Sequence, residues 1–262
     1  APVSALLHAV AVVKAGAFGI VRLVYDVYGI SLVHELGLLM LLSAIASVTI
    51  LFGSIRALSQ QELKPRLAYS TISQVSYIVL GISLFGPFGT IAGLVHLMHQ
   101  GLMKVTLFYC AGNYAEELGI HRIDELDGAG RRMPLTSLAF TVGALGMIGL
   151  PPVAGFISKW YLGIGAVQAD MSWAIAVLAA SSLLNAAYFL PIVHRLWFRQ
   201  GPAHGHGRWP EERHLGRFET STWLLLPTAA TALFSILVGL LAGVSFSPLD
   251  LATFMATEEY LP

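Results

Sequence analysis

The stretch from Gly93 to Gly112, GLVHLMHQGLMKVTLFYCAG, is apolar enough to lie in a lipid bilayer, although it contains two histidines, a glutamine and a lysine. On a helix, His96, Gln100 and Lys104 are spaced i, i+4 and i+8, so they form one polar stripe. An ammonium group at the bilayer centre costs roughly 2.5–3.5 kcal/mol on insertion scales, and it therefore usually faces protein or a water-filled interior. A lysine near a helix end can instead extend to the membrane surface. Because apolar residues continue on both sides of Lys104, the pattern favours the interior position.

The composition is that of an integral membrane protein. Of the 262 residues, 56% are hydrophobic and only 11% are charged, whereas soluble domains contain about 25% charged residues. The formal net charge is zero, which gives no reason to expect nucleic acid as a partner. The one cysteine, Cys110, excludes an internal disulfide and a cysteine-ligated iron–sulfur cluster within this chain.

The start of the sequence carries no signal-peptide pattern. Its first residue is Ala1 rather than methionine, and Pro2 leads directly into an apolar segment. We therefore expect the sequence to be a piece of a longer protein.

Eight segments approach the roughly 20 apolar residues that a membrane-spanning helix needs. They are Val3–Tyr25, Leu36–Ala57, Leu67–Leu84, Thr90–Ala111, Leu135–Leu150, Gly155–Val167, Trp173–Trp197 and Trp223–Val244. The fifth and sixth are short and are separated only by residues 151–154, in the motif GLPPVAGF. Adjacent prolines cannot continue a helix, because each one removes a backbone donor and clashes with the preceding turn. The two short segments are therefore either two crossings or one crossing by a broken helix.

The distribution of lysine and arginine separates these alternatives, because cytoplasmic loops of membrane proteins are enriched in both. With one broken crossing, eleven basic residues fall in loops on one side and one, Arg22, falls on the other. With two crossings, the five arginines from Arg195 to Arg217 move to the opposite face. We therefore predict an all-α protein with about seven transmembrane helices, the fifth of them broken. We expect it in a bacterial inner membrane with its arginine-rich loops in the cytoplasm.

We expect one transmembrane domain over residues 1–245, with a cytoplasmic loop at about 199–220. The tail, residues 246–262, is predicted to form a short amphipathic helix along the membrane surface. The loop contains three histidines: His204, His206 and His214. They lack helical metal-ligand spacing and lie in glycine-rich chain, so the pattern favours a flexible loop over a metal site.

Lysine is rare in this chain and is placed differently from arginine. Four lysines stand against eleven arginines, and nearly all the arginines lie in loops. Desolvation shifts the pKa of a lysine readily whereas a guanidinium stays charged, so lysine suits a group that gains and loses protons. Lys14 lies deep in its apolar segment, and no Asp or Glu occurs in the apolar body of any predicted crossing. We therefore expect a carboxylate partner for Lys14 to come from the absent part of the longer protein or from another subunit.

Lys64 and Lys159 lie at helix boundaries. Lys64 begins the third segment beside Pro65, where an interface lysine is common, although the hydroxyl and amide side chains that follow could line water. Lys159 lies just beyond the proline pair. Broken helices expose unpaired backbone groups that are tolerated only inside protein or against water, and their ends often bind ions in transporters. The alternative is a lysine at the membrane interface beside Trp160 and Tyr161. The pattern favours a functional lysine at the break, facing protein or water.

Four stretches of the chain resemble, in order, the motifs of one family of membrane subunits. They are PVSALLHAVAVVKAG, QQELKPRLAYSTISQVSY, HLMHQGLMKVTLF and GLPPVAGFISKWYL, which begin at Pro2, Gln60, His96 and Gly149. The similar proteins are the antiporter-like subunits shared by respiratory complex I, membrane-bound hydrogenases and Mrp-type cation/proton antiporters. The resemblance extends from Pro2 to about Phe198.

The resemblance implies a fourteen-helix fold with two inverted five-helix repeats, of which this chain contains the second repeat and its flanking helices. It also implies a proton path of buried side chains, carried over by position to Lys14, Lys64, His96, Lys104 and Lys159. Nearby polar side chains would support this path: His99, Gln100 and Ser158. A lysine at position 159, rather than the glutamate of one complex I subunit, is most similar to the D-type subunits of Mrp antiporters and to hydrogenase-type subunits.

The sequence departs from the family's pattern at three points. Gln100 takes the place of the second histidine of an H-x-x-x-H-x-x-x-K motif, and His99 could replace it only with a rotated geometry. Pro65 occupies a position that is commonly basic. The glutamate–lysine pair of the first half has no counterpart here, so this half alone is not expected to pump protons.

The leading hypothesis is a proton-translocating membrane subunit that carries protons and, in one alternative, Na⁺. Its partners would be the lipid bilayer and other membrane subunits, such as those of an NADH:quinone oxidoreductase-like complex. The sequence contains no nucleophile–base pair and no metal-ligand set, so we expect no cofactor and assign no catalytic residue. A static membrane subunit with buried lysine ion pairs is the main alternative. A solute transporter with a pocket near the GLPP break is another.

Overall fold

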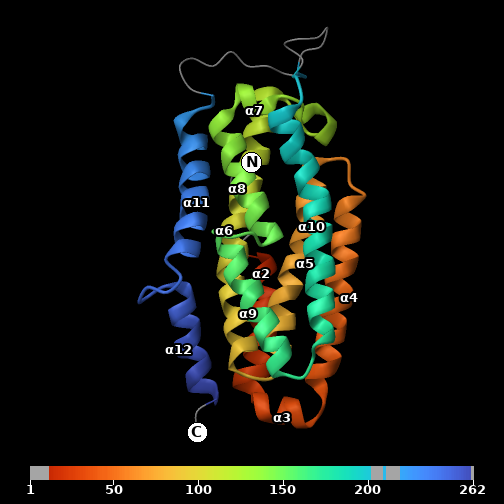
Figure 1. Cartoon of the computed structure of the whole chain (residues 1–262), viewed down its shortest axis with the longest axis vertical. Helices are drawn as coiled ribbons and strands as arrows, with labels where there is room; N and C mark the ends of the chain where they lie inside the picture. The colour runs from red at the N-terminus through yellow and green to blue at the C-terminus, as the bar shows by residue number, and fades with distance from the viewer. Residues whose placement is uncertain (1–11, 202–208, 211–218, 261–262) are drawn as a thin grey trace.

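The computed structural model describes residues 12–201, 209–210 and 219–260, and its regular elements are helices that form an elongated bundle (Figure 1). This confirms the prediction of an all-helical chain. The long helices are α2 (Val12–Arg22), α4 (Leu38–Leu58), α5 (Leu63–Ser83), α6 (Pro87–Leu118), α8 (Pro134–Ile148), α9 (Ala154–Gln168), α10 (Trp173–Phe198), α11 (Thr222–Leu240) and α12 (Pro248–Tyr260). The short elements are η2 (Leu23–Val27), α3 (Ile30–Glu35), η3 (Ile123–Leu126) and α7 (Ala129–Arg132). The start of the first predicted segment and the loop histidines His204, His206 and His214 lie outside the described residues.

Helix α6 is the element around which the others pack. It contacts α5, α8, α9, α11 and α12 along its 32 residues. It begins after Gly86 with Pro87 in its first turn, where the missing proline N–H is not needed for the helix. It ends before Gly119, whose φ of 66° is the left-handed conformation that commonly terminates helices.

Helices α8 and α9 follow one another along the bundle and are separated near its middle (Figure 1). α8 ends at Ile148, Gly149 has a φ of 94°, and α9 begins at Ala154. The break therefore lies where the GLPPVAGF motif predicts it. Because α9 continues in the direction of α8, the two halves together run the length of the bundle once.

Within the part of the chain that the structure describes, three helices are long and apolar enough to cross a membrane by length and composition: α4, α10 and α11. α8 is a shorter apolar helix of 15 residues. α5 and α6 are at least as long as α4, but they carry many of the buried polar side chains of the bundle.

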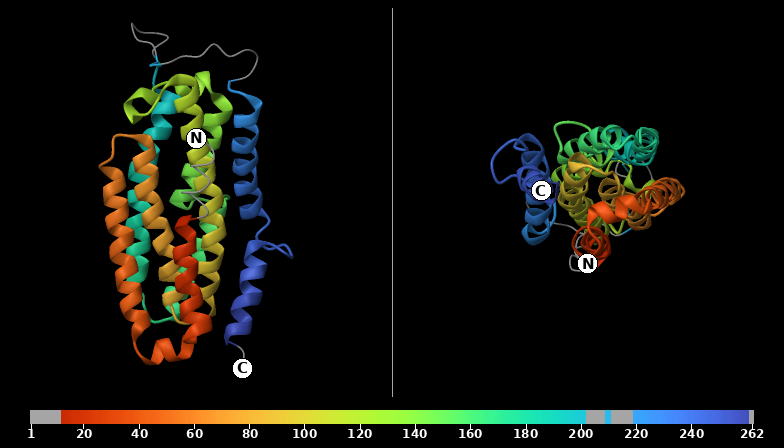
Figure 2. Two further views of the ribbon diagram at one scale, coloured as in Figure 1. Left: turned by 180° about the vertical axis from the view of Figure 1, so that it is seen from behind. Right: turned by 90° about the horizontal axis from the view of Figure 1, so that it is seen from below.

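Part of the predicted tail forms α12, which continues below α11 and runs along the bundle beside α6 (Figures 1 and 2). On its inner face, Ala252 and Ala256 pack against Ile91 and Val95 of α6. Its outer face exposes large apolar side chains, of which Phe254 is 66% exposed. The tail is thus packed onto the bundle along one face.

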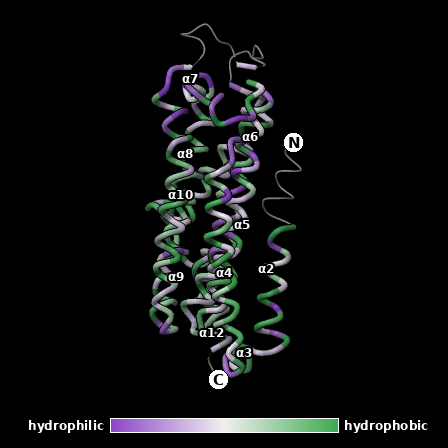
Figure 3. Tube along the Cα trace, turned by 90° about the vertical axis from the view of Figure 1, so that its right-hand side faces the viewer, coloured by the Kyte–Doolittle hydropathy of each residue, from purple (hydrophilic) through white to green (hydrophobic). Residues whose placement is uncertain are grey.

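The two ends of the bundle differ in charge. Hydrophilic residues gather at the end formed by α7, whereas hydrophobic residues predominate along the long helices (Figure 3). Asp127 at this end accepts hydrogen bonds from Arg195 at 2.9 Å and Arg199 at 3.4 Å. An isolated antiparallel bridge between Glu62 and Arg122 ties the α4–α5 connection to the same end. We call this the arginine-rich end, and the opposite end, at α3 and the start of α6, the arginine-poor end.

Candidate functional site

The polar stripe of α6 lies inside the bundle. His96, Gln100 and Lys104 are each fully buried. The ammonium group of Lys104 donates to the carbonyl oxygen of Leu67 at 3.1 Å and to the hydroxyl of Ser70, both on α5. The stripe therefore faces α5.

Antiparallel packing of α5 and α6 brings two glutamines together. Ser70 contacts Lys104 at one position, and a Cβ atom at Gly81 would lie 2.7 Å from the Cα of Gly93 at another. Small residues at such a crossing allow two membrane helices to approach closely. In this register Gln74 lies opposite Gln100. Both are fully buried, and none of their four amide atoms has a hydrogen-bond partner among the described residues.

His96 links this pair of helices to the broken helix. Its Nδ1 atom lies 2.8 Å from the hydroxyl of Ser158 on α9. Its ring stacks on Tyr77 of α5, with the ring centroids 5.2 Å apart. Because a histidine ring nitrogen can donate or accept, the His96–Ser158 bond is compatible with either tautomer.

Lys159 binds the C-terminal end of α8, at the break between α8 and α9. Its ammonium group donates to the carbonyl oxygens of Met147 and Ile148, each at 2.9 Å, and to Ser182 at 3.0 Å. These carbonyls belong to the last turn of α8, where no following turn supplies N–H donors and the helix dipole favours a cation. The lysine thus points into the protein, 5.4 Å from the Tyr77 ring centroid, while the neighbouring Trp160 is 59% exposed.

A cavity of about 780 Å³ opens beside this break, between α9 and α10. Its wall is largely apolar and includes Leu150, Phe156 and Leu183. Lys159 and Ser182 are the polar side chains in the described wall, and they are bonded to each other.

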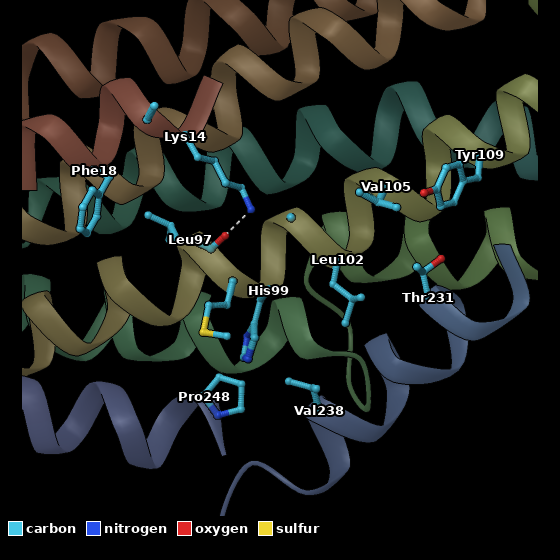
Figure 4. A pocket seen from close by; sticks show the side chains of 13 residues that line it. Lys14, Phe18, Leu97, His99, Leu102, Val105, Tyr109, Thr231, Val238 and Pro248 are labelled. Carbon is cyan, nitrogen blue, oxygen red and sulfur yellow. Dashed lines mark hydrogen bonds between the residues drawn. The ribbon is translucent and has the colours of Figure 1, made fainter. Parts of the chain in front are cut away.

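Lys14 approaches α6 from the other side. Its ammonium group donates to the carbonyl oxygen of Leu97, and the residue is 8% exposed. It borders a cavity of about 670 Å³ between α2, α6, α11 and α12 (Figure 4). His99 lines the same cavity and points toward Pro248 and Val238, away from the α6 stripe. His99 therefore does not replace the missing second histidine of that stripe.

The structure separates Lys64 from the other candidates. Lys64 is exposed in the first turn of α5, whereas Arg66, two residues later, is buried. The guanidinium group of Arg66 donates to three backbone carbonyls, those of Leu58, Gln60 and Tyr188. A guanidinium group stays charged, so Arg66 holds the end of α4 to α5 and α10 without exchanging protons.

Lys14 and Lys104 are buried and Lys159 is half-buried, and none of the three has a carboxylate within ion-pair distance among the described residues. The ion pairs found there connect residues near the helix ends, such as Arg122 with Asp124 and Arg195 with Asp127. Lys14, Lys104 and Lys159 bind carbonyl and hydroxyl oxygens instead. Such neutral acceptors stabilise an ammonium group less than a carboxylate does, and they leave the neutral amine accessible.

Sequence reasoning missed Tyr77 as part of this site, and it placed Gln74 only among the side chains after Lys64 that could line water. Both lie in the stretch that follows Lys64, and their spacing of four and seven residues from Ser70 predicts one face of a helix. That signal was present, but only the pairing of α5 with α6 shows that this face meets the stripe. We call Lys104, Gln100, Gln74, His96, Tyr77 and Lys159 the central column.

Comparison with known proteins gives the family. Residues 1–185 match the family model described as NADH:quinone oxidoreductase/Mrp antiporter, TM. The chain belongs to this family. Its members are integral membrane subunits, in agreement with the buried polar residues and apolar outer faces described above.

Individual relatives agree with this assignment. The chain is 36% identical over 247 residues to NADH-quinone oxidoreductase subunit N of Desulforudis audaxviator, covering 92% of this chain and 48% of the relative. It is 29% identical to a probable K⁺/H⁺ antiporter A/B subunit of Rhizobium meliloti, over 100% of this chain and 25% of the relative. A chain of the Mrp complex from a Dietzia species superposes with a TM-score of 0.74 and 27% identity, over 85% of this chain and 47% of that chain.

A chain of respiratory complex I from Thermus thermophilus shares the fold, with a TM-score of 0.70 and 24% identity over 86% of this chain and 45% of that chain. The chain therefore spans about half the length, or less, of the relatives that it matches.

Proposed function

We propose that this chain is the proton-conducting part of a membrane subunit in an Mrp-type antiporter or a complex I-like or hydrogenase-like assembly. Its partners would be the other membrane subunits of that assembly, and the transported ion would be the proton, with Na⁺ exchange as a variant of the same function. The names of the relatives support this proposal, because they include both NADH-quinone oxidoreductase and antiporter subunits.

The observation that carries the proposal is the pair of buried glutamines between the lysines. Four amide atoms of Gln74 and Gln100 lie in the interior without a protein partner among the described residues. Buried amides are normally hydrogen-bonded, and a polar space between them is a favourable position for ordered water. A hydrated segment at this point would connect Lys104 with His96.

The proposed path follows the central column. A proton would pass from Lys104 through water at Gln100 and Gln74 to His96. It would continue through the Ser158 hydroxyl, which bonds His96, to Lys159 at the end of α8. Ser158 and Lys159 are adjacent residues of α9. A water molecule between the Ser158 hydroxyl and the Lys159 ammonium group would complete the proton transfer without a direct hydrogen bond between them.

Lys14 and Lys64 would connect this path to its surroundings. Lys14 contacts the backbone of α6 next to His96, and it also borders the 670 Å³ cavity. Lys14 would therefore exchange protons between α6 and the part of the subunit that lies beyond this cavity. Lys64 is exposed at the arginine-rich end, where it would collect protons for Lys104. His99 would assist Lys14 rather than Lys104, because it lines the same cavity as Lys14.

We infer seven membrane crossings, with α8 and α9 counted as one. The arginine-rich end would face the cytoplasm of a bacterial cell, as the excess of arginine in membrane-protein loops generally indicates. The end-to-end arrangement of α8 and α9 supports this count.

Two other functions make different demands on the same residues. A static subunit would hold its buried lysines in permanent ion pairs, yet the described acceptors of these lysines are neutral oxygens. A solute transporter would use the 780 Å³ cavity beside the break, and saturable binding of a small organic substrate there would support it.

Replacing the central lysine tests the proposal. In the intact complex reconstituted into liposomes, Lys104→Ala should lower proton flux by roughly 10²-fold or more, the range of a lost proton-transfer group. Assembly should be retained, because the ammonium group makes two hydrogen bonds and one contact with the Phe189 ring among the described residues. Undiminished flux in this variant would contradict the proposal.

Infrared titration separates proton carriers from static ion pairs. Lysines labelled with a heavy nitrogen isotope should show changes in protonation during turnover, and these changes should disappear in Lys104→Ala. A lysine signal that stays constant through turnover would favour the static subunit.

A further inference from the structure

Three hydroxyl groups from three different elements meet at the arginine-poor end of the bundle. The Thr90 hydroxyl on α6 lies 2.5 Å from the phenol oxygen of Tyr25 on η2 and 3.2 Å from that of Tyr260 on α12. The phenol oxygen of Tyr260 also accepts a hydrogen bond from the backbone N–H of Gly86, at 3.1 Å. Thr90 is thus the centre of a chain of three hydroxyls.

The three members of this chain differ in exposure. Thr90 is 2% exposed and Tyr25 is 8% exposed, whereas Tyr260 is half-buried at the end of α12. The outer member of the chain therefore borders the surface, and the inner members lie in the protein.

The inner members lie on helix faces that lead back to the proposed proton carriers. On α6, Thr90 lies seven residues before Leu97, so the two residues share one face of the helix. The carbonyl oxygen of Leu97 accepts the hydrogen bond from Lys14. Seven residues separate Thr90 from Leu97, which corresponds to about 10 Å along the helix.

Tyr25 also lies on a helix face that leads to Lys14. Eleven residues are close to three helical turns, so Tyr25 lies on the face that carries Lys14, and both residues are buried. Tyr25 is placed by η2, a π-helical segment. Such segments are rare and frequently occur at functional sites, because the wider turn redirects a side chain.

We infer that Tyr25, Thr90 and Tyr260 form a hydroxyl relay that carries protons between Lys14 and the arginine-poor face. This inference rests on the proposed function. Each hydroxyl can accept one hydrogen bond while it donates another. A proton received on the oxygen of one member is balanced by release of that member's own hydroxyl proton to the next, so no charge stays on the chain.

The alternative is that the three hydroxyls only hold α12 and η2 to α6, since hydroxyl groups commonly bond neighbouring membrane helices. Isosteric substitutions distinguish the two roles. Thr90→Val and Tyr260→Phe remove the reactive oxygen and keep the shape of the side chain. Tyr28→Phe is a matched control, because Tyr28 lies three residues after Tyr25 and is 57% exposed.

The experiment measures proton flux in liposomes that contain the intact complex, in H₂O and in D₂O. We expect Thr90→Val and Tyr260→Phe to reduce flux by about tenfold, as for the loss of a positioned proton-transfer group, and to increase the solvent isotope effect. Thr90→Ser, which keeps the hydroxyl, should restore most of the flux. Tyr28→Phe should match the unsubstituted complex.

The outcomes separate this inference from the proposed function. Unchanged flux and isotope effect in Thr90→Val and Tyr260→Phe, with flux lost in Lys104→Ala, would overturn the relay and leave the central column in place. Flux that is independent of Lys104 as well would overturn both. If Thr90→Val lowers complex assembly, Tyr260→Phe decides the question, because it removes an oxygen at the half-buried end of α12.

Discussion

Helix α6 carries two buried polar clusters, and they differ in how completely their atoms are bonded. The central column lies beside α5 and α9 and leaves the amide atoms of Gln74 and Gln100 without partners among the described residues. The second cluster lies toward the arginine-rich end, between α6, α8 and α11. Its members are Asn113, Glu117, Thr136, Glu219, Thr220 and Thr228, and we call it the upper cluster.

Hydrogen bonds within the upper cluster satisfy nearly all of its polar atoms. The Glu219 carboxylate accepts hydrogen bonds from the backbone N–H groups of Leu135 and Thr136, at 2.8 and 2.7 Å, and from the Thr136 hydroxyl at 2.8 Å. These are free donors of the first turn of α8, so the carboxylate caps that helix. Asn113 donates to Thr228 at 3.1 Å and joins α6 to α11.

The difference shows that burial of polar groups is not sufficient to mark a conducting site. In the upper cluster, Oε2 of Glu117 is the one buried side-chain polar atom without a partner among the described residues. A cluster bonded to this extent fixes helices in place, because movement breaks hydrogen bonds that water cannot replace. A cluster with unpartnered atoms needs water and can rearrange as protons pass. We therefore propose a structural role for the upper cluster beside the conducting role proposed for the central column, and four substitutions test this difference.

The largest effect is expected at Lys159, where charge and proton exchange can be separated. Lys159→Arg keeps a cation with several donors for the α8 carbonyls, but a guanidinium group does not release its proton. We expect proton flux in reconstituted complexes to fall by roughly 10²-fold, with assembly retained. Full activity of this variant would indicate that position 159 needs only a static positive charge.

Gln100→Met tests the hydrated segment directly. Methionine has a similar volume and offers no strong hydrogen bond, so it should remove the polar surface on which water is held. We expect flux to fall by about tenfold. The melting temperature should stay constant or rise, since the substitution eliminates unpartnered buried amide atoms. A lower melting temperature with normal flux would indicate that Gln100 has a structural role and does not support conduction.

Glu219→Gln should lower the stability of the protein without lowering proton flux, which is the opposite of the result expected for Gln100→Met. The neutral amide is a weaker acceptor for the first turn of α8, and its NH₂ group faces N–H donors, so the helix cap is weakened. We expect a loss of about 1–2 kcal/mol in the free energy of unfolding, measured by denaturation in detergent. Proton flux per assembled complex should not change, and a large loss of flux would place Glu219 on the conduction path.

The smallest effect is expected at Asp124, whose carboxylate is bonded to Arg122 outside the bundle interior. The hydrogen bond from Arg122 lowers the pKa of Asp124, so the pair stabilises the protein above the unfolded-state pKa and loses this contribution as the pH falls. Both side chains are about half exposed, at 52% and 53%, and water screens such pairs. We expect no resolvable change in melting temperature for Asp124→Asn at neutral pH, and none at acidic pH. A clear destabilisation would show that the arginine-rich end contributes more to stability than either buried cluster suggests.

Much of the fold and part of the site could be predicted from the sequence. The apolar segments, the proline-containing break and the stripe of His96, Gln100 and Lys104 all follow from local spacing. The positions of Lys64 and Arg66 could not be predicted in the same way, because both begin the same helix and only packing against α4 and α10 buries one of them. The hydroxyl chain of Tyr25, Thr90 and Tyr260 gave no motif at all.

By itself the sequence determined that this is a helical membrane chain with a broken helix and lysines in its interior. Helical periodicity and the effect of proline are properties of a few neighbouring residues, so they can be read locally. Only the tertiary structure decided which buried polar groups are bonded and which are not. Partners such as Glu219 and Thr136 are 83 residues apart, and no local pattern specifies a contact that depends on how distant helices pack.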